Sequence, residues 1–273
     1  MTSIPSDTKI PQGSLSIKET FKRGLISLIA DNSASRSRVQ LLLEAISIAH
    51  EYTRHRVAAR FGKVVTLVEE WDGHSEALTT EQIASLRAIV TVTSSSIAND
   101  LSSTMRASAV ILAHSHLDNV LTRILMLCVV YDPVPWKQDI YRACKTRYTL
   151  RELDSIDPLK MMKDAAVQFG TQTKHLSISK RNDMLLRHIG RFAKEADVDR
   201  MSKSSLESFD HRRHDLIHAN SLIRTEFDET TDYQCSAVID HAENLIRSLA
   251  EYGDLSWDEL DDLSIPDSAN END

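Results

Sequence analysis

The chain of 273 residues carries a formal net charge of −8 and contains three cysteines. It is long enough to bury a core unaided, and its few, widely separated cysteines favour free thiols in a reducing compartment over a disulfide framework or a paired zinc site. The longest wholly apolar run, 124–131, has eight residues, whereas a membrane helix needs roughly 20. Residues 1–18 are polar and lack the apolar core of a secretory signal, so we expect a cytoplasmic protein with no membrane partner.

The negative charge is concentrated at the C-terminus. Residues 251–273 contain nine acidic side chains and no lysine or arginine, which leaves a charge of +1 for residues 1–250. We therefore interpret 253–273 as an acidic tail. The global charge neither supports nor excludes RNA as a partner.

Helix is expected almost throughout, which predicts an all-α fold. No proline occurs between Pro11 and Pro133 or between Pro158 and Pro266, so helices can run long through both stretches. Helix-forming residues dominate, and no Asn-Gly or Asp-Gly turn joins two alternating apolar runs.

The first part of the chain predicts a disordered lead-in over 1–16 and a helical extension over 17–93. Within the extension, apolar residues recur at helical spacing from 36 to 71, which indicates one long helix or two collinear ones. A polar loop is expected over 72–80. We expect Ser94–Ser96 to break the following helix or to cap the next one.

The strongest predicted element is a helix over 105–131, ended by Asp132-Pro133. Its apolar stripe steps by three or four residues without interruption, which places it at the centre of a bundle. The stripe consists of Ala109, Leu112, His116, Val120, Ile124, Leu127 and Tyr131.

The later elements complete an antiparallel bundle over 94–252. Shorter helices are expected over about 136–153, 158–168 and 179–193. Two clearer helices follow, one capped by Ser202 with the seam Leu206, Phe209, Arg213, Leu216 and Asn220, the other with the seam Val238, Ala242, Leu245, Leu249 and Tyr252.

Arg213 is anomalous because it stands where the seam requires an apolar residue. A buried guanidinium without partners is costly, so Arg213 must face a polar pocket, an interface or a bound anion. His218 follows five residues later. Its unperturbed pKa of about 6.5 suits acid–base chemistry at neutral pH.

The segment Arg213-His214-Asp215-Leu216-Ile217-His218 resembles the motif of HEPN ribonucleases, an arginine followed after four to six residues by a histidine. A polar residue commonly follows the arginine in that family, as His214 does here. The helix over 105–131 is similar to the opening helix of defence-associated HEPN proteins. The resemblance covers about 94–252 and implies a HEPN-type bundle behind the helical extension.

The resemblance implies that the chain is an endoribonuclease that needs no cofactor and no metal. It also implies that the enzyme belongs to a phage-defence or toxin–antitoxin system. The RNA 2′-hydroxyl would attack the adjacent phosphodiester, which restricts the substrate to RNA. Arg213 would neutralise charge on the phosphate, His218 would move protons, and His214 would orient the substrate. A homodimer with a composite active site and a protein inhibitor or antitoxin are expected as partners.

Helix geometry supports the dimer, because Arg213 and His218 lie about 140° apart on a straight helix and cannot share one face. A second chain, or a helix that starts inside the motif, must close this gap. Arg181 and His188 also satisfy the motif, with six residues between them. Arg213 and His218 are preferred because they precede the last bundle helix and Arg213 interrupts an apolar seam.

Two rival interpretations of the motif stay open. His214 and His218, one helical turn apart with His211 before them, are typical of a zinc-protease helix, although Asp215 replaces the glutamate and no further ligand cluster follows. Alternatively, Arg213 pairs with a bundle carboxylate, His218 packs against the core, and the protein is a catalytically inactive helical module that binds protein or RNA.

Basic side chains outside the motif are possible RNA contacts: Arg212, Arg56, Arg60 and Lys63. His114, His116 and Asp118 could form a ligand set, but His116 lies on the apolar stripe and is expected to be a hydrogen-bonded core histidine. The tail contains Trp257, Leu260 and Leu263 at steps of three, which indicates a short amphipathic segment or, alternatively, a solubilising tail. A further hypothesis is that this tail covers the basic site at 211–214.

Overall fold

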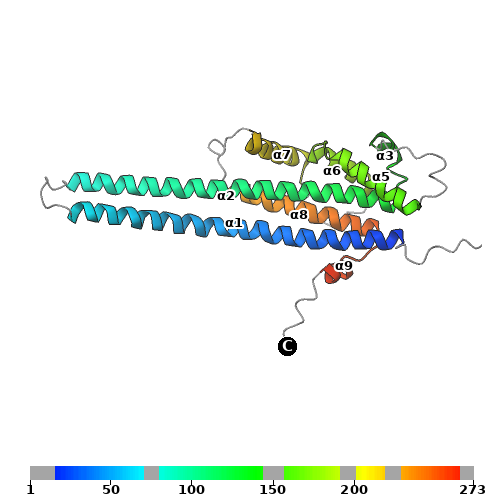
Figure 1. Cartoon of the computed structure of the whole chain (residues 1–273), viewed down its shortest axis with the longest axis horizontal. Helices are drawn as coiled ribbons and strands as arrows, with labels where there is room; N and C mark the ends of the chain where they lie inside the picture. The colour runs from blue at the N-terminus through cyan, green and yellow to red at the C-terminus, as the bar shows by residue number, and fades with distance from the viewer. Residues whose placement is uncertain (1–15, 71–79, 144–156, 191–200, 219–228, 265–273) are drawn as a thin grey trace, which may run out of the picture.

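The computed structural model describes residues 16–70, 80–143, 157–190, 201–218 and 229–264. All elements in these ranges are helices, which confirms the all-α fold (Figure 1). The helices are α1 (Ile17–Glu70), α2 (Thr80–Tyr131), α3 (Lys137–Ala143), α5 (Pro158–Thr173), α6 (Ile178–Ile189), α7 (Lys203–His218), α8 (Glu229–Tyr252) and α9 (Trp257–Ser264).

The two longest helices, α1 and α2, form an antiparallel hairpin whose far end projects beyond the other helices (Figure 1). α1 is one long helix, the first of the two alternatives that the apolar spacing left open, and it begins at Ile17. The expected break at Ser94–Ser96 is wrong, since α2 is continuous there. The Ser94 hydroxyl donates to the Thr91 carbonyl at 3.0 Å and is 1% exposed, so the helix satisfies this serine internally.

The start of the predicted extension is part of the bundle core. Buried side chains of α1 share one apolar cluster with the second half of α2. Those of α1 are Phe21, Leu25, Leu28, Ile29 and Val39. α2 also crosses the expected boundary at residue 93 without interruption. The predicted extension and the predicted bundle therefore share one hydrophobic core.

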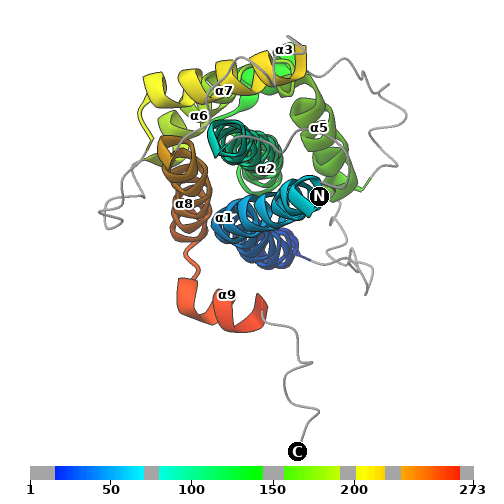
Figure 2. The same cartoon turned by 90° about the vertical axis from the view of Figure 1, so that its left-hand side faces the viewer.

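The second half of α2 lies at the centre of the bundle, as its stripe predicted (Figure 2). It ends at Tyr131, immediately before Asp132-Pro133, as expected. α5 packs along this half, α8 lies against both α1 and α2, and α6 and α7 cover a further side. The predicted helix over 136–153 corresponds to α3, with 144–156 outside the described residues.

The acidic C-terminal segment contributes an amphipathic helix, α9, that packs on α1. Leu260 is 1% exposed, and the Arg247 guanidinium lies 4.2 Å from the centroid of the Trp257 ring. Figure 2 shows α9 on the side of the bundle opposite α7. The hypothesis that the tail covers 211–214 is therefore wrong for α9, and residues 265–273 lie outside the described part.

Across the described helices, none combines the length and the apolar character needed to span a bilayer.

Candidate functional site

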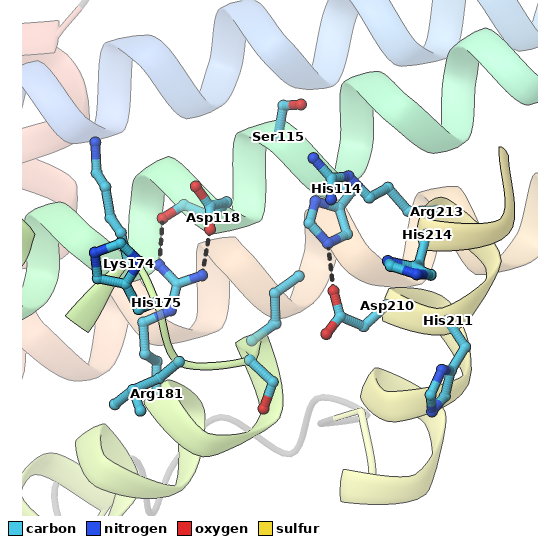
Figure 3. Close-up of a pocket in the computed structure, with 13 residues that line it drawn as sticks. His114, Ser115, Asp118, Lys174, His175, Arg181, Asp210, His211, Arg213 and His214 are labelled. Atoms are coloured by element: carbon cyan, nitrogen blue, oxygen red, sulfur yellow. Dashed lines mark hydrogen bonds and ion pairs between the residues drawn. The ribbon is translucent and has the colours of Figure 1, made fainter. Parts of the chain in front are cut away.

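A pocket of about 520 Å³ lies where α7, the middle of α2 and the connection between α5 and α6 meet (Figure 3). Its lining is rich in ionisable groups. The histidines are His114, His175, His211 and His214. The cations are Lys174, Arg181 and Arg213, and the carboxylates are Asp118 and Asp210. Cations outnumber carboxylates before any histidine is protonated, so the pocket suits an anionic ligand.

Arg213 reaches this pocket because of its position on α7. Ser202 caps the helix, its hydroxyl oxygen accepting from the Ser205 amide at 3.1 Å. Leu206, Phe209 and Leu216 bury the seam against the bundle. Arg213 lies on the edge of that seam, half-buried and pointing into the pocket (Figure 3). A polar pocket is thus the surrounding that explains a cation at this position.

The Arg213 guanidinium is unsatisfied at one atom. Its Nε is buried and has no hydrogen-bond partner among the described residues. A buried N–H that lacks a partner costs about 1–3 kcal/mol. The Nε of Arg181 is also buried without a partner, but Arg181 forms an ion pair with Asp118, whereas no hydrogen bond or ion pair joins the Arg213 guanidinium to a described residue.

A second polar pair lies beside Arg213, where His114 of α2 meets Asp210 of α7. His114 Nε2 lies 2.8 Å from an Asp210 carboxylate oxygen, and the imidazole is stacked on Phe209. His114 is 6% exposed. Burial lowers the pKa of His114 below its usual value; Asp210 opposes that shift and Arg213 adds to it. The imidazole is therefore neutral at neutral pH, and its Nε2–H donates to the carboxylate.

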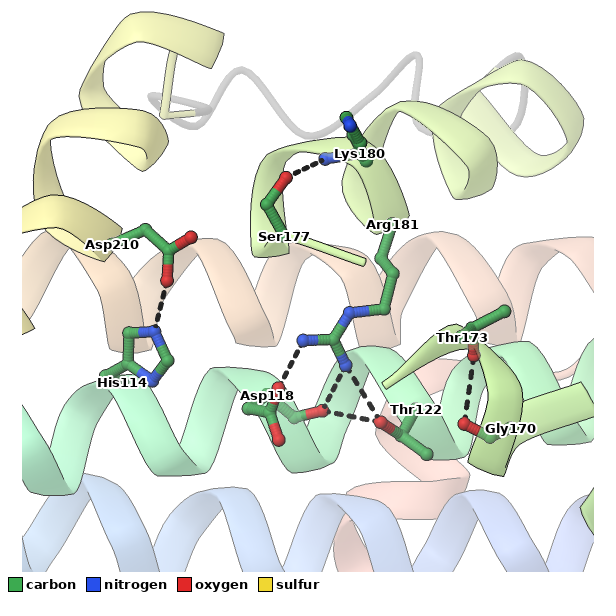
Figure 4. A network of polar contacts seen from close by, with 9 residues as sticks. All are labelled: His114, Asp118, Thr122, Gly170, Thr173, Ser177, Lys180, Arg181 and Asp210. Atoms are coloured by element: carbon green, nitrogen blue, oxygen red, sulfur yellow. Dashed lines mark hydrogen bonds and ion pairs between the residues drawn. The ribbon is translucent and has the colours of Figure 1, made fainter. Parts of the chain in front are cut away.

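The rival motif is explained by structural contacts (Figure 4). The Arg181 guanidinium, 1% exposed, forms an ion pair with Asp118 and donates to the Thr122 hydroxyl at 3.0 Å. His188 packs elsewhere, its ring centroid 4.1 Å from that of Trp136. Arg181 lines the pocket, but it is committed to α2, and His188 does not join it there.

The preferred motif is helical throughout. α7 runs without a break to His218, its last residue, so the alternative of a helix starting inside the motif is wrong. His214 is exposed and lines the pocket, as does His211. The side chain of His218 lies outside the described part. Within one chain, the structure thus brings Arg213 and His214 to the same pocket.

The other predicted RNA contacts lie away from this pocket. Arg212 donates to the Thr231 hydroxyl on α8 at 3.0 Å, which joins the two helices. Arg56, Arg60 and Lys63 are exposed on the projecting part of α1, and Arg56 donates to the Tyr52 hydroxyl at 2.6 Å. None of the four lines the pocket.

The histidines of α2 have separate roles. His116 Nε2 lies 2.7 Å from Asn32 Oδ1 inside the core, which confirms it as a hydrogen-bonded core histidine, and burial lowers its pKa to about 4. In the described ranges no group of three or more His, Cys, Asp or Glu side chains could hold a metal ion. That finding opposes the ligand set of α2. The zinc interpretation of the motif depends on His218, whose side chain lies outside the described part.

Sequence reasoning missed Asp210, Lys174 and His175, and it assigned His114 to a ligand set only. Asp210 had a detectable signal, because it precedes Arg213 by three residues and so projects from the same face of α7. Lys174 and His175 had none, since they reach the pocket only through the packing of α5 and α6 against α2.

A scan against family models finds no match, and comparisons with curated proteins and with solved structures find no significant similarity.

Proposed function

We propose that this chain is a metal-independent endoribonuclease of the HEPN type, which cleaves RNA by attack of a 2′-hydroxyl on the adjacent phosphodiester. The observation that carries the proposal is Arg213. The arginine of the motif, on a seam that should be apolar, lines a polar pocket, and its guanidinium forms no hydrogen bond or ion pair with a described residue. A phosphate group is an acceptor that such a guanidinium binds well.

The surroundings of Arg213 favour a phosphodiester over a smaller or apolar ligand. The pocket is lined by the exposed His211 and His214 of α7, and Lys174 and His175 on its opposite side can hold further parts of an anionic strand. Arg213 would neutralise charge that develops on the phosphorus oxygens in the transition state. His214, exposed at the rim, would orient the substrate.

His218 is assigned proton transfer, as the family motif implies. Because α7 is helical over the whole motif, His218 and Arg213 of one chain diverge by about 140°. We infer that the active enzyme is a homodimer in which the ends of two α7 helices meet and complete two composite sites. A cytoplasmic setting in phage defence or a toxin–antitoxin system, with a protein inhibitor or antitoxin, belongs to the same proposal.

The test incubates purified protein with total RNA in the presence of EDTA and determines the fragment ends. Cleavage that leaves cyclic-phosphate and 5′-hydroxyl ends, abolished in Arg213→Ala and His218→Ala, is the expected result. His50→Ala is the control, because His50 contacts Asn99 on the projecting hairpin, away from the pocket. Intact RNA with the wild-type protein and all variants would favour the alternative, a helical module that binds protein or RNA without cleaving it.

A further inference from the structure

The pocket holds an acid–base pair that the Arg–His motif does not contain. His114 and Asp210 come from α2 and α7, 96 residues apart in sequence, and meet at 2.8 Å. Arg213 projects from α7 toward the same imidazole (Figure 3). Carboxylate, imidazole and guanidinium therefore lie next to one another within a single chain.

The Asp210 contact settles which nitrogen of His114 can accept a proton. A carboxylate only accepts hydrogen bonds, so Nε2 of the neutral ring carries the hydrogen and Nδ1 carries the lone pair. None of the described residues hydrogen-bonds to Nδ1, and Nδ1 is not among the buried polar atoms that lack a partner. It thus keeps contact with the solvent of the pocket that His114 lines.

The other core histidines of the bundle have a different chemistry. His116 meets Asn32 and His241 meets Asn182, and in both pairs the partner is an amide oxygen. An amide fixes a ring by hydrogen bonding but cannot stabilise an imidazolium as a carboxylate does. Neither His116 nor His241 lines the pocket. Only His114, of these three, combines a carboxylate partner with access to the pocket.

Resting on the proposed function, we propose that His114 is the general base that takes the proton of the attacking 2′-hydroxyl, and that Asp210 is the residue that positions it. The 2′-oxygen forms a bond to phosphorus while its proton passes to Nδ1 of His114. The bond from phosphorus to the 5′-oxygen breaks, and that oxygen receives a proton from the acid, the role given above to His218. The products are a cyclic phosphate and a 5′-hydroxyl, and the two proton transfers balance.

The charges that face His114 agree with this role. They are Asp210 and Arg213 from α7 and Asp118 from its own helix. Because burial lowers the pKa of His114, the base is unprotonated through neutral pH, and activity should fall only in more acidic solution. Arg213 beside it would hold the phosphate whose ribose presents the hydroxyl.

The experiment compares RNA cleavage by the full chain and its His114→Ala, Asp210→Asn and His50→Ala variants over a range of pH, with circular dichroism to verify folding. His114→Ala is expected to lose about 10²–10⁴-fold in rate, to lose the acidic limb of the pH profile and to recover activity with added imidazole. Asp210→Asn is expected to lose at least about tenfold and to shift that limb, since a positioning carboxylate acts through the imidazole. His50→Ala should match the wild type.

The outcomes separate this inference from the proposed function. Cleavage that needs Arg213 but persists in His114→Ala with an unchanged pH profile overturns the role of His114 and leaves the nuclease intact. If His114→Ala does not fold, the pH profile of Asp210→Asn decides the question, and an unshifted acidic limb overturns the inference. A wild-type protein that cleaves no RNA overturns both.

Discussion

Replacing Arg213 with methionine should separate activity from stability. Methionine has a similar length and fills the edge of the apolar seam, but it has no donor for a phosphate. The buried Nε of Arg213 has no partner, and removing such a group relieves a cost of about 1–3 kcal/mol. Because the half-buried stem of the arginine also packs, we expect Arg213→Met to be as stable as the wild type or up to about 1 kcal/mol more stable.

The same substitution should abolish most of the proposed cleavage. Loss of one donor to the charge that develops in a transition state typically costs a factor of about 10²–10³, or about 2.7–4 kcal/mol. A stable, inactive variant is the signature of a residue kept for function.

Arg181→Met is the matched comparison, because Arg181 belongs to the rival motif and lines the same pocket. Its guanidinium pairs with Asp118 and donates to the Thr122 hydroxyl, although its Nε, like that of Arg213, is buried without a partner. Losing it leaves the partly exposed carboxylate unpaired and should destabilise the fold by about 2–3 kcal/mol, below the range for a fully buried pair.

Urea denaturation followed by far-UV circular dichroism measures both stabilities, and the RNA assay in EDTA measures both activities. A loss of more than about 2 kcal/mol in Arg213→Met, or cleavage at the wild-type rate, would refute the functional interpretation of Arg213.

Three further predictions concern the scaffold. Burial lowers the pKa of His116 to about 4 in the folded chain, whereas the same histidine has a pKa of about 6.5 in the unfolded chain, so the unfolded chain binds more protons below pH 6.5. The free energy of unfolding should therefore be highest at neutral pH and fall by about 2 kcal/mol between pH 7.5 and 5. Urea titrations measure this fall, which should be smaller in His116→Gln. An equal fall in that variant would contradict the assignment. A Cβ on Gly253 would lie 2.3 Å from Phe21 Cε1, so Gly253→Ala should lower the thermal midpoint, with a cost of about 1–3 kcal/mol. Deleting 254–273 should destabilise the chain through loss of the buried Leu260, and an unchanged thermal midpoint would argue against the packing of α9.

The sequence pattern predicted correctly those features of α2 that depend on residues close together in the chain. The stripe of α2 from Ala109 to Tyr131 required a buried helix whatever packed against it, and Asp132-Pro133 had to end that helix. The expectation that Ser94–Ser96 would break the helix failed, because a serine hydroxyl can bond within its own helix once tertiary packing holds the helix in place.

For the candidate site, too, the sequence predicted some features and left others open. A cation at Arg213 on an apolar seam was visible in the sequence, since periodicity assigns each residue to a face. Which of the two arginines forms an ion pair within the fold was not visible, because the answer depends on Asp118 of α2 lying opposite Arg181 of α6.

Helix content, the central position of α2 and the anomaly at Arg213 thus follow from the order of residues alone, because residues within about one helical turn decide them. The tertiary structure decided that His114 faces Asp210 and that α9 lies away from α7. Contacts between segments far apart in sequence depend on how whole helix faces pack, and no periodicity within either segment encodes the partner it meets.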